Sequence, residues 1–232
     1  MQNKNLIAIA ENSNPRCLVY SKDGEKKGQV WLSGVPDSIA VITCVNNNLI
    51  GITLIFQQKV CVVDTNKMQV VKAIVVHDDC MGLVCFDNLL IANCANDGLI
   101  YIAKSGKIVK ENKYIKGELY CHVDTQGNLY SVYRNTNNIH VNNLINNKRY
   151  IYFMEEIIDP AGLTTDRDNN LFVACMEMDM IFVNHSLHSP AKTVLDRPDG
   201  IKGPSSIDYD KENDELLVVN NHSRSILIFK KK

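Results

Sequence analysis

The stretch Asn88-Leu89-Leu90-Ile91-Ala92 is one of six copies of a short pattern, in which a polar residue precedes Leu and a run of β-forming residues. The other copies are Asn5-Leu6-Ile7-Ala8-Ile9, Asn48-Leu49-Ile50-Gly51-Ile52, Asn128-Leu129-Tyr130-Ser131-Val132, Asn170-Leu171-Phe172-Val173-Ala174 and Glu215-Leu216-Leu217-Val218-Val219. Successive Leu positions in these copies differ by 43, 40, 40, 42 and 45 residues. A strand-rich repeat of about 40–50 residues is typical of a propeller, in which each repeat is one small sheet. We therefore predict an all-β, six-bladed β-propeller.

The repeats divide the chain into six segments of one predicted domain, residues 1–232. Their approximate bounds are 1–35, 36–77, 78–116, 117–158, 159–202 and 203–232. The middle segments each contain up to four β-rich runs, separated by turn-forming residues such as Gln126-Gly127-Asn128 and Asp168-Asn169-Asn170. The first and last segments have room for three runs each, so we expect incomplete first and last blades. A chain that begins inside its domain would explain this, because an upstream segment could supply the missing strands.

Composition excludes several classes of protein. Hydrophobic residues make up 45% of the 232 residues and charged residues 22%, which are ordinary globular values. The net charge of -1 provides no global basic field for nucleic acid or an anionic membrane. No apolar run approaches the roughly 18 residues that a membrane helix needs, and the N-terminus does not read as a secretory signal. We expect a cytoplasmic protein without a membrane contact.

The eight cysteines do not form a zinc pattern. They are Cys17, Cys44, Cys61, Cys80, Cys85, Cys94, Cys121 and Cys175, and none belongs to a Cys-x-x-Cys pair. Zinc sites need ligands paired at such short spacings. Most of the eight lie in strand-like runs, so we expect buried, reduced thiols.

The last two segments carry a recognisable signature. Asp159-Pro160-Ala161-Gly162-Leu163-Thr164-Thr165-Asp166, followed by Asn169 to Ala174, resembles the NHL repeat, whose pattern is Pro-x-Gly-Ile-x-x-Asp, a turn and a Val-Ala strand. Gly203-Pro204-Ser205-Ser206-Ile207-Asp208 is similar to a second copy, with Arg224 and Ile226 before its third strand. The middle segments lack the Pro-x-Gly start, and they lack an Arg at the position that corresponds to Arg224. The resemblance therefore covers roughly the last 70 residues closely, while the period covers the whole chain.

The resemblance implies a binding module. NHL propellers stand at the C-terminus of tripartite-motif ubiquitin ligases, after a RING, B-boxes and a coiled coil. The paired Cys/His ligands of those zinc modules are absent from this sequence. The chain would accordingly be the partner-reading part of such a ligase, with no enzymatic activity, no cofactor and no small-molecule substrate of its own.

Four carboxylates occupy positions where we expect a partner to bind. The innermost strands of a propeller begin around one mouth of its central channel, so residues just before them should converge. Those positions hold Asp37, Asp79, Glu118 and Asp159. An acidic opening would attract a basic protein partner or hold a hard cation. We predict partner binding there and no metal.

Two alternatives remain open from the sequence. Six-bladed hydrolases of the paraoxonase and gluconolactonase type hold Ca²⁺ in the channel, and Glu118, Asp159 and Asp208 offer oxygen ligands without a matching motif around them. Some NHL propellers bind RNA, which needs a basic face with aromatic side chains. The best such patch contains Arg134, Lys148, Arg149 and Tyr150. We rank both alternatives below protein binding.

Overall fold

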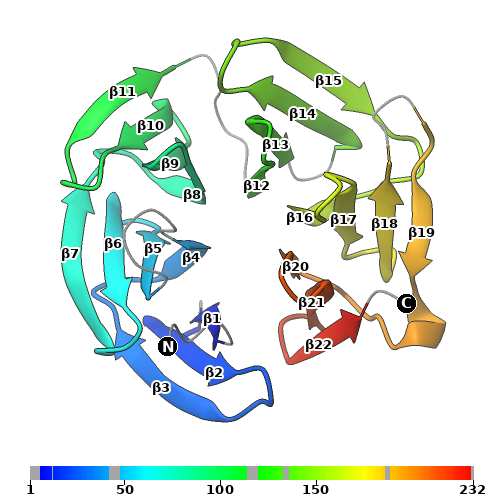
Figure 1. Cartoon of the computed structure of the whole chain (residues 1–232), viewed down its shortest axis with the longest axis horizontal. Coiled ribbons are helices and arrows are strands. Elements are labelled where there is room, and N and C mark those ends of the chain that lie inside the picture. Colours follow the sequence, from blue (N-terminus) through cyan, green and yellow to red (C-terminus); the bar gives the residue numbers. More distant parts are fainter. Residues whose placement is uncertain are drawn as a thin grey trace. The chain divides into compact units, whose positions relative to one another are not determined.

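The computed structural model describes residues 6–11, 13–41, 48–113, 120–132, 136–185 and 189–230. The chain consists of two compact units, Met1–Glu118 (unit 1) and Leu119–Lys232 (unit 2), with three antiparallel sheets in each (Figure 1). The described residues contain no α-helix, and one short 3-10 turn, η1 (Arg197–Asp199). No helix in the described part of the chain is long and apolar enough to cross a membrane.

Unit 1 holds the first three sheets. They are β1 (Leu6–Glu11), β2 (Arg16–Ser21) and β3 (Lys26–Trp31); β4 (Pro36–Val41), β5 (Leu49–Leu54), β6 (Lys59–Asp64) and β7 (Gln69–Val75); and β8 (Cys80–Phe86), β9 (Leu89–Cys94), β10 (Gly98–Ile102) and β11 (Ile108–Asn112). Each sheet is a meander in which every strand pairs antiparallel with the next.

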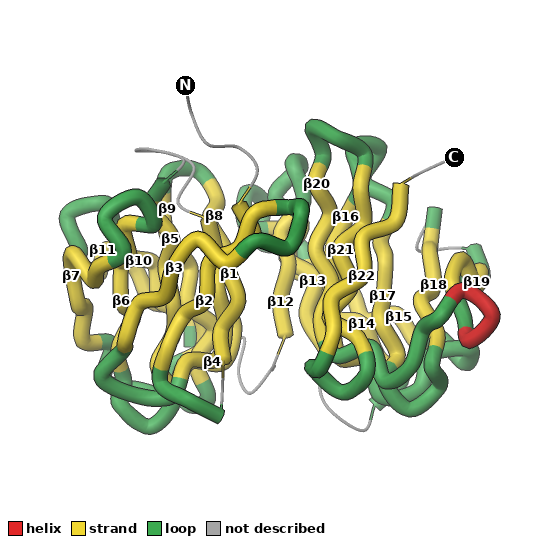
Figure 2. Tube along the Cα trace, turned by 90° about the horizontal axis from the view of Figure 1, so that it is seen from below, coloured by secondary structure: helices red, strands yellow, loops and turns green. Residues whose placement is uncertain are grey.

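Unit 2 holds the other three sheets. They are β12 (Tyr120–Val123), β13 (Asn128–Val132), β14 (Asn138–Asn143) and β15 (Arg149–Phe153); β16 (Pro160–Thr165), β17 (Leu171–Cys175), β18 (Met180–Asn184) and β19 (Lys192–Leu195); and β20 (Ser206–Asp210), β21 (Glu215–Asn220) and β22 (Ser225–Lys230). Figure 2, in which strands are yellow and η1 is red, shows that strands and turns make up nearly all of the described chain. The predicted all-β, six-bladed propeller class is confirmed, and so are the three-stranded first and last sheets.

Apolar side chains fill the space between neighbouring sheets of a unit. In unit 1 one cluster joins Cys17 and Val19 of the first sheet to Ile52 of the second, and in unit 2 another joins Val132 to Val173. Middle strands are therefore buried on both faces and read as continuous apolar runs. The outer strands β7, β11, β15 and β19 are largely exposed.

Gly162 explains the glycine of the resembled motif. A Cβ built on it would lie 3.0 Å from the backbone N of Ile207 and from Cα of Ser206. Those are backbone atoms of the next sheet and its β20 strand, which cannot turn aside as a flexible side chain would. Glycine at this position therefore allows β16 and β20 to approach closely.

Candidate functional site

Four loops of unit 1 are joined in series by hydrogen bonds, and we call them the unit-1 rim: residues 32–35, 55–58, 76–79 and 95–97. The Ile55 amide donates to the carbonyl oxygen of Val35 at 3.0 Å. The Val76 amide donates to the Gln58 carbonyl at 2.9 Å, and the Ala95 amide donates to the Asp79 carbonyl at 2.9 Å. Each loop thus fixes the backbone of the next one.

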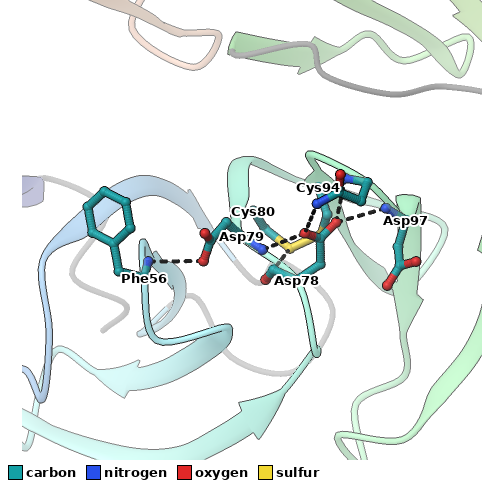
Figure 3. Close-up of a disulfide and its surroundings, with 7 residues drawn as sticks. Phe56, Asp78, Asp79, Cys80, Cys94 and Asp97 are labelled. Carbon is teal, nitrogen blue, oxygen red and sulfur yellow. Dashed lines mark hydrogen bonds between the residues drawn. A yellow bond between two sulfur atoms is a disulfide. The ribbon is translucent and has the colours of Figure 1, made fainter.

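Phe56 is the most exposed large apolar side chain of this rim. It is 81% exposed, and its φ of 62° lies in the left-handed region that bulky residues rarely adopt. Its backbone N–H donates to Oδ1 of Asp79 at 3.1 Å. In Figure 3 the ring extends away from Asp78 and Asp79. The fold therefore holds an aromatic ring in solvent on an unusual backbone conformation.

The neighbouring Gln57 fixes the same turn from the other side. Its side-chain amide nitrogen donates to the Ser33 carbonyl oxygen, and the Ser33 hydroxyl donates to Gln57 Oε1 at 2.9 Å. The β5–β6 turn is thus held between the β3–β4 loop and Asp79. A side chain on a turn held in this way loses little freedom when it binds a partner.

Asp78 organises the β9–β10 turn from within. Its side chain is 4% exposed, and its carboxylate accepts hydrogen bonds from the amides of Asp79 (2.8 Å), Asn96 (2.7 Å) and Asp97 (2.8 Å) and from Asn96 Nδ2 (3.0 Å). Burial alone would raise the pKa of this carboxyl, but these donors outweigh it and hold the pKa below its usual value. The carboxylate is therefore charged and serves as a structural acceptor.

A disulfide lies next to Asp78 and Asp79 (Figure 3). Cys80 of β8 and Cys94 of β9 are opposed in the sheet and bonded to each other. The prediction that all cysteines are reduced thiols is wrong for this pair, because the register brings the two residues together. Cys17, Cys61 and Cys175 are buried thiols as expected, and burial raises the pKa of Cys17 to about 11 and that of Cys175 to about 12.

The predicted carboxylates do not all hold equivalent positions. Asp79 and Asp159 stand just before the first paired residue of β8 and of β16, whereas Asp37 lies one residue inside β4. Asp37 and Asp79 belong to unit 1 and Asp159 belongs to unit 2, while Glu118 lies outside the described residues. Their convergence at one opening stays a prediction. The structure adds the contact of Asp79 with Phe56, which the sequence did not predict.

Unit 2 has a polar cluster that the sequence did not reveal. His122 Nε2 lies 2.8 Å from Thr165 Oγ1, and Lys211 Nζ donates to the same hydroxyl at 3.1 Å. Burial, and next the Lys211 ammonium, lower the pKa of His122 to about 4, so the ring is neutral and shares a hydrogen bond with the Thr165 hydroxyl. Thr165 is 0% exposed, so its hydroxyl is not open to a substrate. This arrangement joins β12, β16 and the β20–β21 turn, and we interpret it as structural.

Asp-x-x-x-Asn turns support the same ends of the unit 2 strands. Oδ1 of Asp124 accepts the amides of Gln126 and Asn128, both at 2.8 Å, and its Oδ2 accepts Asn128 Nδ2 at 2.8 Å. Asp166 repeats this arrangement with Asp168 and Asn170. The matching spacing was visible in the sequence. It marks turn formation and not a ligand site.

The remaining predicted residues fall at separate places. Lys148, Arg149 and Tyr150 are exposed at the start of β15, and Arg134 lies outside the described residues. Asp208 lies on β20, where its carboxylate accepts the Tyr209 amide at 2.9 Å. No group of three or more His, Cys, Asp or Glu in the described part of the chain could hold a metal ion. RNA binding stays a prediction.

Comparison with known proteins identifies the fold. No protein-family model and no curated protein sequence matches the chain. The chain is similar to the hydrazine synthase of Kuenenia stuttgartiensis, with a TM-score of 0.75 and 12% identity over 100% of this chain and 94% of that one. It is also similar to a chain of the nidogen/laminin complex, with a TM-score of 0.77 and 14% identity over 97% and 89%. Identities this low show a shared propeller fold, and NHL identity stays a prediction.

Proposed function

We propose that this chain is a non-catalytic protein-interaction propeller, which holds a partner through the unit-1 rim with Phe56 at the centre of the contact. The observation that carries the proposal is the ring of Phe56, 81% exposed on a turn that Asp79 and Ser33 fix. Aromatic side chains that enter a partner's pocket supply a large part of the binding energy in protein interfaces. A fixed turn adds to this because less motion is lost on binding.

The charge of the rim indicates the class of partner. Asp37, Asp79 and Asp97 are half-buried carboxylates in or next to the rim loops, and Lys113 lies 3.8 Å from Asp97 at its edge. A partner with Lys or Arg next to an apolar residue would complement an exposed ring whose backbone is bonded to the Asp79 carboxylate. The structural neighbour from the nidogen/laminin complex is itself part of a protein complex, which supports the same class of function.

The finer parts of the proposal rest on the sequence. The signature in residues 159–230 supports an NHL-type propeller that reads partners within a tripartite-motif ubiquitin ligase. The cytoplasmic location belongs to the same proposal. The oxidation state of Cys80 and Cys94 in cells would test that location, because disulfides are rare in the cytosol.

A peptide library displayed on phage tests the proposed function without a known partner. We expect selection on the full chain to enrich peptides in which Lys or Arg flanks an aromatic or aliphatic residue. Phe56→Ala should weaken the affinity of the chain for these peptides by about tenfold or more, because it removes the central apolar contact. Ile145→Ala is the matched control, since Ile145 is also an exposed apolar residue on a turn, 68% exposed. If the peptides bind both variants equally well, the unit-1 rim is not their binding site.

A further inference from the structure

β15 is the outermost strand of its sheet, whose order is β12-β13-β14-β15. The Asn143 amide donates to the Lys148 carbonyl at 2.9 Å, and the Met154 amide donates to the Asn137 carbonyl at 3.0 Å. The backbone groups of Lys148 and Met154 are therefore directed toward β14. Because these directions alternate along a strand, the N–H and C=O groups of Arg149, Ile151 and Phe153 point to the outer side. No described strand pairs with that side.

The side chains of β15 make this edge unusually apolar. Ile151 is 66% exposed, Phe153 65% and Tyr150 47%. The other outer strands of unit 2 expose less, with Val194 of β19 at 40% and Ile228 of β22 at 37%. Outer strands commonly carry charges along their length that discourage pairing, as Lys72 does in β7 and Lys110 and Glu111 do in β11. β15, like β19, carries one charge, on its first residue, but β15 exposes the larger apolar side chains.

Charges of opposite sign flank the apolar part of the strand. Lys148 and Arg149 are exposed at its start, and Glu155 and Glu156 are exposed just after its end. An antiparallel copy of the same strand would bring each basic end next to an acidic end. This arrangement favours a second copy of the chain over a uniformly charged partner.

Symmetry restricts the possible register. A two-fold axis normal to an antiparallel pair of identical strands places one residue opposite its own counterpart. With Tyr152 in that position, Ile151 faces Phe153 of the other copy, and Lys148 and Arg149 lie next to the turn with Glu155 and Glu156 that follows β15 of the other copy. With Ile151 in that position, Arg149 would face Phe153, and Lys148 would face Met154. The first register matches charges and apolar side chains, and the second does not.

We propose that β15 is a self-association edge, where two copies of this chain pair antiparallel about a two-fold axis at Tyr152 and form one continuous eight-stranded sheet. The outward backbone groups of Ile151 and Phe153 then exchange hydrogen bonds with the same residues of the other copy. Their side chains form an apolar contact on the solvent face. The basic start of each strand lies beside the acidic turn of the other copy, and this charge complementarity favours the register.

Sedimentation velocity over a wide concentration series tests the proposal with the full chain. The wild type should dimerise, and added salt should weaken the dimer. Lys148→Glu/Arg149→Glu and Glu155→Lys/Glu156→Lys should each weaken self-association at least about tenfold, because like charges then face each other. An equimolar mixture of the two variants should recover a heterodimer. The control is Lys192→Glu/Arg224→Glu, which makes the same charge change at exposed residues outside β15 and should dimerise like the wild type.

Ile151→Pro examines the backbone contact separately. The Ile151 N–H points away from β14, so proline removes an outward donor and leaves the β14–β15 hydrogen bonds in place. We expect a folded monomer by circular dichroism and sedimentation. A wild type that stays monomeric at all concentrations would overturn the proposal. So would a dimer that persists in Ile151→Pro, or charge variants that do not associate when mixed.

Discussion

At the scale of the residue, Asp78 and Asp79 are adjacent carboxylates with different partners. Asp78 is buried and accepts four hydrogen bonds, three of them from backbone amides. Asp79 is half-buried and accepts the amide of Phe56 from a neighbouring loop. One carboxylate therefore builds the β9–β10 turn and the other fixes the exposed aromatic ring. The hydrogen bonds of Asp78 favour its charged form, because charged acceptors form the stronger hydrogen bonds.

Asp78→Asn should destabilise the chain in a pH-dependent way. The amide keeps the shape but loses the charge that the N–H donors favour, so we expect a loss of about 1–3 kcal/mol near neutral pH. The pKa of Asp78 is lowered in the folded chain. Its contribution is therefore complete above the unfolded value of about 3.9, and it disappears as the pH falls through the folded pKa.

Urea unfolding of wild type and Asp78→Asn at several pH values measures this contribution. The difference in unfolding free energy should shrink below about pH 4. Asp97→Asn serves as the control, because it keeps the backbone amide that Asp78 accepts and changes only a carboxylate in a surface ion pair with Lys113 at 3.8 Å, a kind of pair typically worth less than about 1 kcal/mol. A difference that stays constant with pH would show that charge is not the cause.

At the scale of the element, the β8–β9 hairpin shows that local sequence predicts where strands lie but not which of their residues pair. The strand positions were predictable from their apolar runs, since the repeated run Asn88 to Ala92 falls at β9, which is found at Leu89–Cys94. The pairing of Cys80 with Cys94 depends on a shift in register between Cys80 and Gly82. Without this shift Met81 would face Cys94. A bulge is set by the contacts of the whole sheet, so the cysteine pattern alone did not predict the bond.

Phe56 was missed for a related reason. Positive φ is usually predicted from Gly, Asn or Asp in a turn. None of these residues occurs in the stretch Ile55-Phe56-Gln57-Gln58 around it. The conformation depends on Asp79, which is 23 residues away in sequence. Asp79 itself was correctly placed just before an inner strand, because the repeat fixes where β8 begins. The sequence thus located the loops of the candidate site but not the contacts between them.

Reduction of the Cys80–Cys94 bond should lower the stability of the chain. The bond joins residues 14 apart, and closing a loop of this size stabilises a protein by about 3 kcal/mol in the chain-entropy model. We expect dithiothreitol to lower the melting temperature by several degrees. The Cys80→Ser/Cys94→Ser variant should melt near the reduced wild type and should not respond to dithiothreitol. If the reductant acts equally on both proteins, another cysteine is responsible.

At the scale of the whole molecule, the six sheets follow from the six Leu-anchored repeats. Each anchor that the structure describes lies in or beside the second strand of its sheet, from Leu49 in β5 to Leu216 in β21, except that Leu6 begins β1. In the part of the chain that the structure describes, the first sheet has three strands, and its Leu anchor lies in the first of them. The function cannot be derived from this regularity, because propellers share an architecture and not a chemistry.

Calcium provides a test between the proposed interaction role and the hydrolase alternative in the intact chain. The described residues offer no group of three or more acidic, His or Cys side chains for a metal, so we expect added Ca²⁺ to leave the melting temperature unchanged. A specific site filled at 100 times its dissociation constant would add about 2.7 kcal/mol to the stability. In a domain of this size that would raise the melting temperature by several degrees. Differential scanning fluorimetry distinguishes the interaction module from the hydrolase. The melting temperature is measured with Ca²⁺, with Mg²⁺ as a control for ionic strength, and again after EDTA is added. A rise with Ca²⁺ alone that EDTA reverses would favour the hydrolase and contradict a metal-free interaction module.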